Sequence, residues 1–572
     1  MFLPTTKEEI IKLGWEKLDV ILVSGDSYID SPYIGIAVIG KLLLSQGYRV
    51  GIIAQPDYNT SEDITRLGEP ELFWGVSGGS VDSMVANYTA SKKKRRQDDF
   101  TPGGENNKRP DRAVIAYSNL IRRYFKNTKP IVLGGIEASL RRVVHYDFWS
   151  DKLRRSILFD SKADYIVYGM GEKAVLEMAA KFKKKKSPDN VKGLCYISNE
   201  PKYEYLQIPS FEDCLQSKKT FTEMFNLFYN NNDAITARGL YQQTGDRYFI
   251  QNPPQPNPSV DEIDSYYDMD YERELHPFYL KDGKVRALDT IRFSITTHRG
   301  CYGECNFCAI AVHQGRTIVS RSKDSIIKEA EKFTLNKNFK GNIMDVGGPT
   351  ANMYDYECDK KLKLGVCDTK RCVFPDTCKA LKPTHKPQIE LLKDLQKISG
   401  VNKVFVASGI RYDLVTDDKE FGYEYLKQVV SKHTSGQMKI APEHSNDKVL
   451  ELMGKPGKKS LEKFKDMFYK YTREAGKDQY LTYYFIAAHP GCTDKEMETL
   501  KEFASDKLSI SPEQVQIFTP TPSTYSTLMY YTEMNPFTNQ KIFVEKNLSG
   551  KMAQKDIITQ KENKRYRKTN YK

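Results

Sequence analysis

The chain has 572 residues and a formal net charge of +13, a length that allows two or three domains. A mean hydropathy of −0.58 and the lack of any run of eighteen apolar residues argue against a membrane helix. The first ten residues are charged and lack a signal-peptide apolar region, so we expect a cytoplasmic protein with no membrane partner. Lys and Arg occur in short runs, which favour solvated surfaces over a nucleic-acid patch.

Strands alternate with helices in the N-terminal third. Residues 18–54 predict strand, helix and strand, with Gly47 as a helix stop. Further apolar strands fall within 71–79, 129–135 and 163–172. This alternation predicts an α/β fold with a doubly wound parallel sheet, whose functional loops gather at the carboxyl edge.

The chain divides into four parts in our interpretation. Residues 15–200 form the first α/β domain, and 201–286, which include a proline-rich stretch, form a connecting region. Residues 287–540 form a second domain. Residues 541–572 are a basic tail that we expect to be disordered, because it has little apolar surface to bury.

Repeated strand–helix units begin near residue 287. Strands are predicted at 290–297, 342–347, 403–408, 437–441, 480–487 and 514–518. Helices are predicted between them at 323–336, 386–397, 421–432, 460–474 and 494–507. Six such units indicate a partial (β/α)6 barrel of the TIM type, with chemistry at the C-terminal ends of the strands.

Cysteines cluster in the second half, where seven of the ten lie between residues 301 and 378. In a cytosolic chain this clustering indicates metal binding rather than disulfides. Cys301, Cys305 and Cys308 form a C-x3-C-x2-C pattern directly after a predicted strand. Three thiolates on one loop can hold three irons of a [4Fe–4S] cluster and leave the fourth iron open, whereas a structural zinc site normally has four protein ligands. The pattern therefore predicts an iron–sulfur cluster.

A second cysteine group follows, with the spacing C-x8-C-x4-C-x5-C. It comprises Cys358, Cys367, Cys372 and Cys378. Four thiolates in so short a stretch can close a zinc or an iron–sulfur site. The spacing matches neither a zinc ribbon nor a ferredoxin. Whether this group binds a metal, and which one, is left open.

The string HRGCYGECNFCAI, which begins at His298, resembles the signature of the radical S-adenosylmethionine (radical SAM) enzymes and, in particular, of the YgiQ-type proteins. The resemblance implies that the open iron binds SAM and that reductive cleavage of SAM yields a 5′-deoxyadenosyl radical. The N-terminal half is similar to the flavodoxin-like or cobalamin-binding-like domain of many radical SAM proteins. Its loop 24–32 has no histidine to ligate cobalt, so we expect no histidine-ligated cobalamin.

The same resemblance implies which residues lie near SAM. Phe307 corresponds to an aromatic residue whose backbone lies near the adenine. Gly347 and Gly348 correspond to a glycine pair that contacts the methionine amino group, although this chain has Gly-Gly-Pro in place of the commoner Gly-Gly-Glu. Arg411 is a candidate for pairing with a carboxylate, and Glu443 for accepting hydrogen bonds from the ribose. No residue is identified as catalytic.

The predicted function is a radical SAM enzyme acting on an unknown substrate, with RNA among the candidates. A low-potential electron donor of the flavodoxin or ferredoxin type would be its partner. The alternative is a non-catalytic iron–sulfur sensor or nucleic-acid-binding protein. A tRNA methylthiotransferase is disfavoured because those enzymes carry three further cysteines in the N-terminal domain, whereas this chain has none before Cys195.

Overall fold

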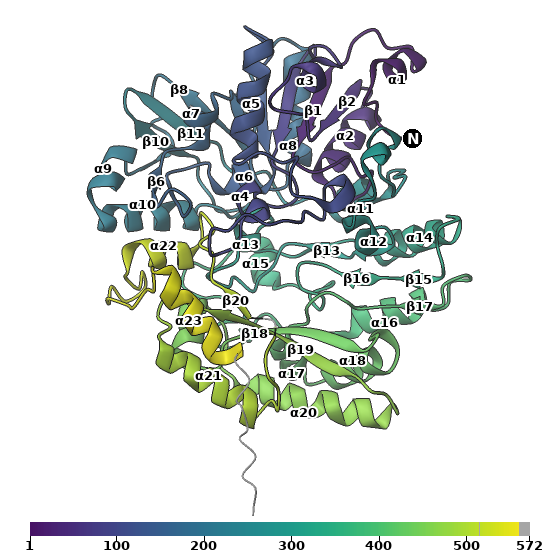
Figure 1. Cartoon of the computed structure of the whole chain (residues 1–572), viewed down its shortest axis with the longest axis vertical. Coiled ribbons are helices and arrows are strands. Elements are labelled where there is room, and N and C mark those ends of the chain that lie inside the picture. The colour runs from purple at the N-terminus through teal and green to yellow at the C-terminus, as the bar shows by residue number, and fades with distance from the viewer. Residues whose placement is uncertain (514, 560–572) are drawn as a thin grey trace, which may run out of the picture.

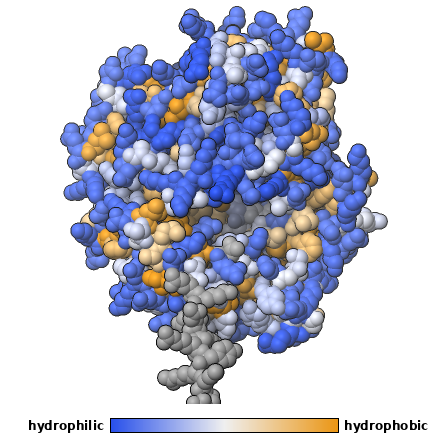
Figure 2. Space-filling model, viewed as in Figure 1, coloured by the Kyte–Doolittle hydropathy of each residue, from blue (hydrophilic) through white to orange (hydrophobic). Residues whose placement is uncertain are grey.

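The computed structural model describes residues 1–513 and 515–559, which form two stacked units (Figure 1). The first unit, purple to teal, is built on a nine-stranded sheet, and the second, green to yellow, on a row of parallel strands. The surface seen in Figure 2 is predominantly hydrophilic, in keeping with the low mean hydropathy. No helix in the described part of the chain has the length and apolar character needed to cross a bilayer.

The predicted doubly wound parallel sheet is confirmed. Its parallel strands run in the order β2 (Val50–Ala54), β1 (Val20–Ser24), β3 (Phe73–Ser77), β4 (Ile131–Gly134) and β7 (Tyr165–Val167). This is the flavodoxin-like order, in which the direction of winding reverses between the first and third strands. Ligands of such folds bind at that switch point, outside the carboxyl ends of the strands.

Helices cover both faces of this sheet because successive side chains of a strand point to opposite sides. In β1, Val20 and Leu22 belong to the apolar cluster that includes α2 (Gly35–Ser45) and α8 (Glu172–Lys183). Ile21 and Val23 belong to a different cluster, which includes α5 (Ala113–Tyr124). A strand buried on both faces has a continuous apolar sequence, which is why these strands could be predicted.

The boundary predicted at residue 200 is wrong. Beyond β8 (Leu194–Ser198), which is antiparallel to β7, the sheet continues through β11 (Arg247–Gln251), β10 (Leu240–Thr244) and β9 (Leu206–Ile208). The region expected to connect the domains also supplies α9 (Phe211–Gln216) and α10 (Lys218–Asn230). The strands were missed because they are short and partly polar. Gly245, with a φ of +61°, forms the tight turn of the β10–β11 hairpin.

The second unit confirms the predicted partial barrel. Its strands are β12 (Ser294–Thr296), β15 and β16 (Asn342–Ile343 and Asp345–Gly347), β17 (Lys403–Val404), β18 (Gln437–Glu443), β19 (Tyr480–Ala487) and β20 (Val515–Ile517). Its outer helices are α14 (Lys323–Thr334), α16 (Lys386–Leu395), α18 (Gly422–Gln428), α20 (Lys459–Glu474) and α21 (Asp494–Asp506). The strand pairs are parallel, and a bridge between Ile410 and Ile440 links the third strand to the fourth. The first strand begins at Ser294 rather than residue 290, because α12 (Ala287–Ile291) precedes it.

Helix α22 (Tyr525–Thr532), which follows the last barrel strand, returns to the first unit. Tyr525 and Leu528 pack into the same apolar cluster as Phe228 of α10. Ser523, just before the helix, donates a 2.7 Å hydrogen bond to the carbonyl of Leu140. The two units therefore share part of one core.

The disorder predicted from residue 541 is contradicted as far as residue 559. Helix α23 (Leu548–Thr559) packs beside α21 and the barrel, and its Gln554 side chain is fully buried. Gln554 accepts a hydrogen bond from the Ala488 amide and donates one to the Cys492 carbonyl, both 3.0 Å long. The helix was not predicted because a buried polar side chain, and not an apolar periodic pattern, anchors it. Residues 560–572 of the predicted tail lie outside the described residues.

Candidate functional site

The three-cysteine loop lies between β13 (His298–Arg299) and α13 (Ile310–His313), just beyond the C-terminal end of β12. Gly300 starts the loop with a φ of +83°, and a Cβ there would lie 2.1 Å from the Thr317 carbonyl oxygen. Glu304 also has a positive φ, of +45°. Within the loop the Cys308 amide donates to the Cys305 carbonyl at 2.9 Å. The backbone is therefore tightly turned where the thiols are needed.

The three cysteines of this loop are half-buried, and their thiols influence one another. Burial first, and then the neighbouring Cys305, raises the pKa of the Cys301 and Cys308 thiols, the latter to about 12. Thiolates in such surroundings need positive charge nearby, and bound iron supplies it. The ligands of a [4Fe–4S] cluster stand further apart than those of a single ion, because each thiolate binds a different iron. The three thiols fit that donor set.

Hydrogen-bond donors surround these sulfurs. The Gly303 amide donates to Cys301 Sγ at 3.4 Å, and Arg411 Nη1 donates to Cys305 Sγ at 3.9 Å. Asp413 holds the Nε–Nη2 edge of the same guanidinium, with two contacts to Nε at 3.0 and 3.1 Å. A Cβ on Gly303 would lie 2.6 Å from Arg411 Nη1. The structure thus places Arg411 against the cysteine loop, with one edge already paired.

The predicted glycine pair closes β16 beside this loop. A Cβ on Gly348 would lie 2.6 Å from two atoms of the His298 ring, whereas one on Gly347 would lie 3.3 Å from Ala351 Cα. His298 is buried, and burial lowers its pKa to about 3, so the ring is neutral. Asp345, two residues earlier, accepts the amide of Ser408 at 3.0 Å. These contacts fix the strand end on which the glycines lie.

Phe307 and Glu443 lie near the same loop. The ring of Phe307 meets His489 edge to face, with centroids 6.4 Å apart. Glu443, in the last position of β18, has a φ of +68° although it is not glycine. Burial raises the pKa of its carboxyl, Lys455 Nζ at 3.9 Å opposes that shift, and the Glu443 charge in turn acts on Cys308. A strained conformation of this kind is typical of functional positions.

The second cysteine group is spread out. Cys358 is buried, Cys372 is half-buried, and both contact the apolar cluster around Tyr302. Burial raises the pKa of Cys372 to about 12, with Lys361 Nζ at 3.8 Å from its sulfur. Cys367 is exposed. Nowhere in residues 1–513 and 515–559 do three His, Cys, Asp or Glu side chains form a site for a single metal ion, so a second metal site stays a prediction.

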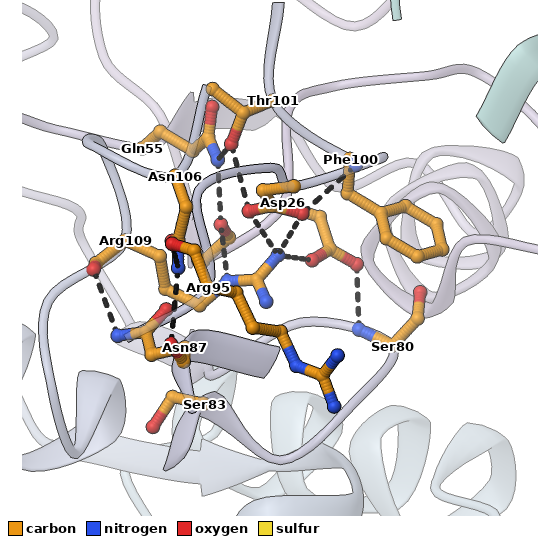
Figure 3. A network of polar contacts seen from close by, with 12 residues as sticks. Asp26, Gln55, Ser80, Ser83, Asn87, Arg95, Phe100, Thr101, Asn106 and Arg109 are labelled. Atoms are coloured by element: carbon orange, nitrogen blue, oxygen red, sulfur yellow. Dashed lines mark hydrogen bonds and ion pairs between the residues drawn. The ribbon is translucent and has the colours of Figure 1, made fainter. Parts of the chain in front are cut away.

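A buried polar network at the switch point of the sheet was not predicted (Figure 3). Arg109 Nη2 contacts Asp26 at 2.6 Å and Asp98 at 3.2 Å, and all three side chains are almost fully buried. Asp26 also accepts the Ser80 amide at 2.6 Å, and so joins the ends of β1 and β3. Gln55 donates to Thr101 at 2.7 Å. The network anchors a long loop that in sequence is only basic and polar.

Comparison with known proteins identifies the family. Residues 2–294 match the model described as radical SAM N-terminal, and residues 295–504 match the radical SAM superfamily. A UPF0313 protein of Fusobacterium nucleatum is 60% identical over 99% of this chain and 100% of its own length. One of Thermotoga neapolitana is 49% identical over 98% of each chain.

A solved structure has a similar fold. It is that of TsrM, a radical SAM methyltransferase from Kitasatospora setae, with a TM-score of 0.51 and 14% identity over 89% of this chain and 74% of that chain. The family matches carry the assignment of the two cofactors, a [4Fe–4S] cluster and SAM. The chain therefore belongs to the radical SAM superfamily and, within it, to the UPF0313 proteins of the YgiQ type.

Proposed function

We propose that this chain is a radical SAM enzyme in which Cys301, Cys305 and Cys308 ligate the cluster. The observation that carries the proposal is the tightly turned cysteine loop at the end of the first barrel strand, with the Arg411 guanidinium 3.9 Å from Cys305 Sγ. Reduced cluster and SAM, when bound, supply one-electron cleavage of SAM to methionine and a 5′-deoxyadenosyl radical that takes a hydrogen atom from the substrate. The cysteines can ligate three of four irons, which leaves one iron for SAM.

The chain's own residues position and shield these groups. Arg411 places a fixed positive charge beside the sulfurs, and such outer contacts tune an iron–sulfur centre. Gly347 and Gly348 line the cavity at the strand end, and their backbone would contact the methionine part of SAM. Phe307, directly before Cys308 in the cysteine loop, would lie on the adenine side, and Glu443 would offer a carboxylate to the ribose hydroxyls.

An external electron source is part of the proposal. The cluster needs a low-potential donor of the flavodoxin or ferredoxin type, which we place with the enzyme in the cytoplasm. Cleavage of SAM consumes only SAM and one electron, so it does not identify the molecule from which the radical takes a hydrogen atom. The residues that line the barrel mouth would select that substrate.

The test uses protein purified and reconstituted without oxygen, reduced with dithionite and given SAM. We expect slow formation of 5′-deoxyadenosine and methionine even without substrate. Cys305→Ala should abolish formation of both products. Cys367→Ser, at an exposed cysteine, should leave their formation unchanged. Fully loaded, reduced protein that binds no SAM and forms no 5′-deoxyadenosine, even with cell extract as a source of substrate, would instead be an iron–sulfur sensor.

A further inference from the structure

A cavity of about 560 Å³ lies between the two units. From the first unit it is lined by the carboxyl ends of β1, β3 and β4, represented by Ser24, Ser77 and Gly134. From the barrel it is lined by the ends of β12 and β16, represented by Thr296 and Gly347. The switch point of the sheet therefore faces the barrel mouth across one continuous space. A volume in the range of small-molecule sites makes this space a candidate binding site.

One end of the cavity is an apolar slot that enters the first unit beneath α2 and α8. The slot is lined by members of the apolar cluster that includes α2 and α8, namely Leu22, Ile34, Ile36, Phe73, Val132, Val167 and Val175. Two glycines line the cavity at places where a side chain could extend into it, since a Cβ built on the exposed Gly35 or the half-buried Gly134 would have no atom within 4 Å. The slot therefore has room for a hydrocarbon group.

The other end of the cavity is polar, and one of its charged pairs is internal. Arg299 forms a 2.5 Å ion pair with Glu172, and both residues line the cavity. Asp345 accepts the Ser408 amide and hydroxyl. Tyr33 reaches over from the first unit to the Thr296 side chain. After the Arg299–Glu172 pair is counted, this end offers hydrogen-bonding groups and one carboxylate, Asp345, which would disfavour an anionic ligand.

The lining argues against an anionic polymer. Arg299 is the one Lys or Arg among the described residues that line the cavity, and Glu172 neutralises it. Phosphate backbones are bound by several unpaired basic side chains. An apolar slot lined by aliphatic side chains does not supply them. RNA, a candidate from sequence alone, does not fit this space.

We infer that the cavity binds the substrate, and that this substrate is an amphiphilic small molecule. A hydrocarbon arm would occupy the slot, and a polar part without negative charge would lie at the barrel mouth beside Gly347, next to the proposed SAM site. The role of this molecule as a substrate rests on the proposed function, but its binding to the cavity can be measured independently of that function. The fold brings the arm and the reacting end together because the slot and the barrel mouth belong to one cavity.

The experiment measures displacement of Nile red, a neutral apolar dye, from the cluster-loaded protein by straight-chain primary alcohols from hexanol to dodecanol. We expect affinity to rise about fourfold for each added methylene, which corresponds to about 0.8 kcal/mol, until the chain fills the slot. Gly134 has a φ of −148°, so valine is compatible with its backbone. Gly134→Val should weaken the binding of the longest alcohols about fifteenfold, the loss of roughly two methylenes of contact, and the series should level off at a shorter chain.

Matched controls keep the result interpretable. Gly457→Val makes the same change at an exposed glycine, where a Cβ would lie 3.3 Å from Asp447 Oδ1, and should leave the series unchanged. Gly35→Val fills the slot from its other wall and serves if Gly134→Val does not fold, as judged by its melting temperature. The inference would be overturned if the affinities of the alcohols did not depend on chain length, or if both slot variants left them unchanged.

The remaining outcomes separate this inference from the proposed function. SAM cleavage without chain-length-dependent binding overturns the inference alone. Alcohol binding by protein that never cleaves SAM overturns the proposed function and, with it, the role of the cavity as a substrate site. Stoichiometric binding of cobalamin that excludes the alcohols and is lost in Gly134→Val would assign the cavity to a corrinoid and also overturn the inference.

Discussion

Two cysteine-bearing regions of the same barrel differ in what the fold does for them. In the first region, Cys301 to Cys308, three thiols lie on one tight turn at a strand end, next to a guanidinium. In the second, Cys358 to Cys378, the thiols range from buried to exposed. Of the second group, Cys358 and Cys372 contact the apolar cluster around Tyr302.

The two regions differ in backbone geometry and in the charges near the sulfurs, which the number of cysteines does not indicate. The smaller group has a glycine-dependent turn, amide and guanidinium donors at its sulfurs, and a place where barrel folds concentrate chemistry. The larger group has Lys361 near the Cys372 sulfur, and the Cys378 amide donates to the Cys372 carbonyl at 2.8 Å, but its members differ widely in exposure. Single substitutions in the two regions test this contrast.

The largest effect is expected from replacing a ligand of the first region. Cys305→Ala should lower cluster content and reduce SAM cleavage more than about a hundredfold, beyond the effect of losing an outer contact. Iron and sulfide analysis and the yield of 5′-deoxyadenosine measure this. Cys367→Ser is the control from the second region. Equal losses in both variants would show that the two regions form one functional unit and would end the contrast.

A smaller effect is expected at Arg411, which links the first region to Asp413. Arg411→Ala should lower SAM cleavage by about 10–100-fold while the cysteines still hold iron, because an outer contact to the cluster is lost. It also leaves Asp413 buried without its partner, which costs about 3–5 kcal/mol. Arg411→Lys should retain more activity, since it keeps the charge but not the paired geometry. Electron paramagnetic resonance during redox titration should show a shifted cluster potential; an unshifted potential in both variants would contradict a tuning role.

Sequence reasoning succeeded where a pattern has a direct physical cause. Strands such as β1 are apolar because both faces are buried, whereas the role of Cys301, Cys305 and Cys308 as cluster ligands stays a prediction. It failed at the β10–β11 hairpin and at α23, where partly polar residues are ordered by partners distant in sequence. The pairing of Arg411 with Asp413 and of Arg109 with Asp26 has no sequence signal beyond residue type. The cavity between the units depends on how they pack, which no local pattern encodes.

The glycine pair next to the first region should respond unequally to one added methyl group. In Gly348→Ala the new Cβ would lie 2.6 Å from the His298 ring, so we expect about 1–3 kcal/mol of lost stability from overpacking. In Gly347→Ala the nearest atoms are at 3.3 and 3.4 Å, so stability should change less. The proposed contact with SAM predicts weaker SAM binding in both. Thermal unfolding and equilibrium dialysis with SAM separate the effects, and a Gly347→Ala variant with normal SAM affinity would argue against that contact.

The smallest effects are expected in the second region, where they decide whether its cysteines act together. If the thiols are independent, Cys358→Ser should cost about 1–3 kcal/mol, because a hydroxyl replaces a thiol in the apolar cluster around Tyr302. Cys367→Ser should then stay within about 0.5 kcal/mol of the parent, as for most exposed positions.

A shared metal would give a different pattern. Each of the four ligands would be needed whatever its exposure, because removal of any one opens the site. Cys367→Ser would then destabilise the protein about as much as Cys358→Ser, and both variants would lose the same amount of metal beyond the first cluster. Denaturant unfolding with metal analysis of the same samples distinguishes the two patterns. From the exposed position of Cys367 we expect unequal losses of stability; equal losses, with equal losses of metal, would establish a second metal site and remove the contrast between the regions.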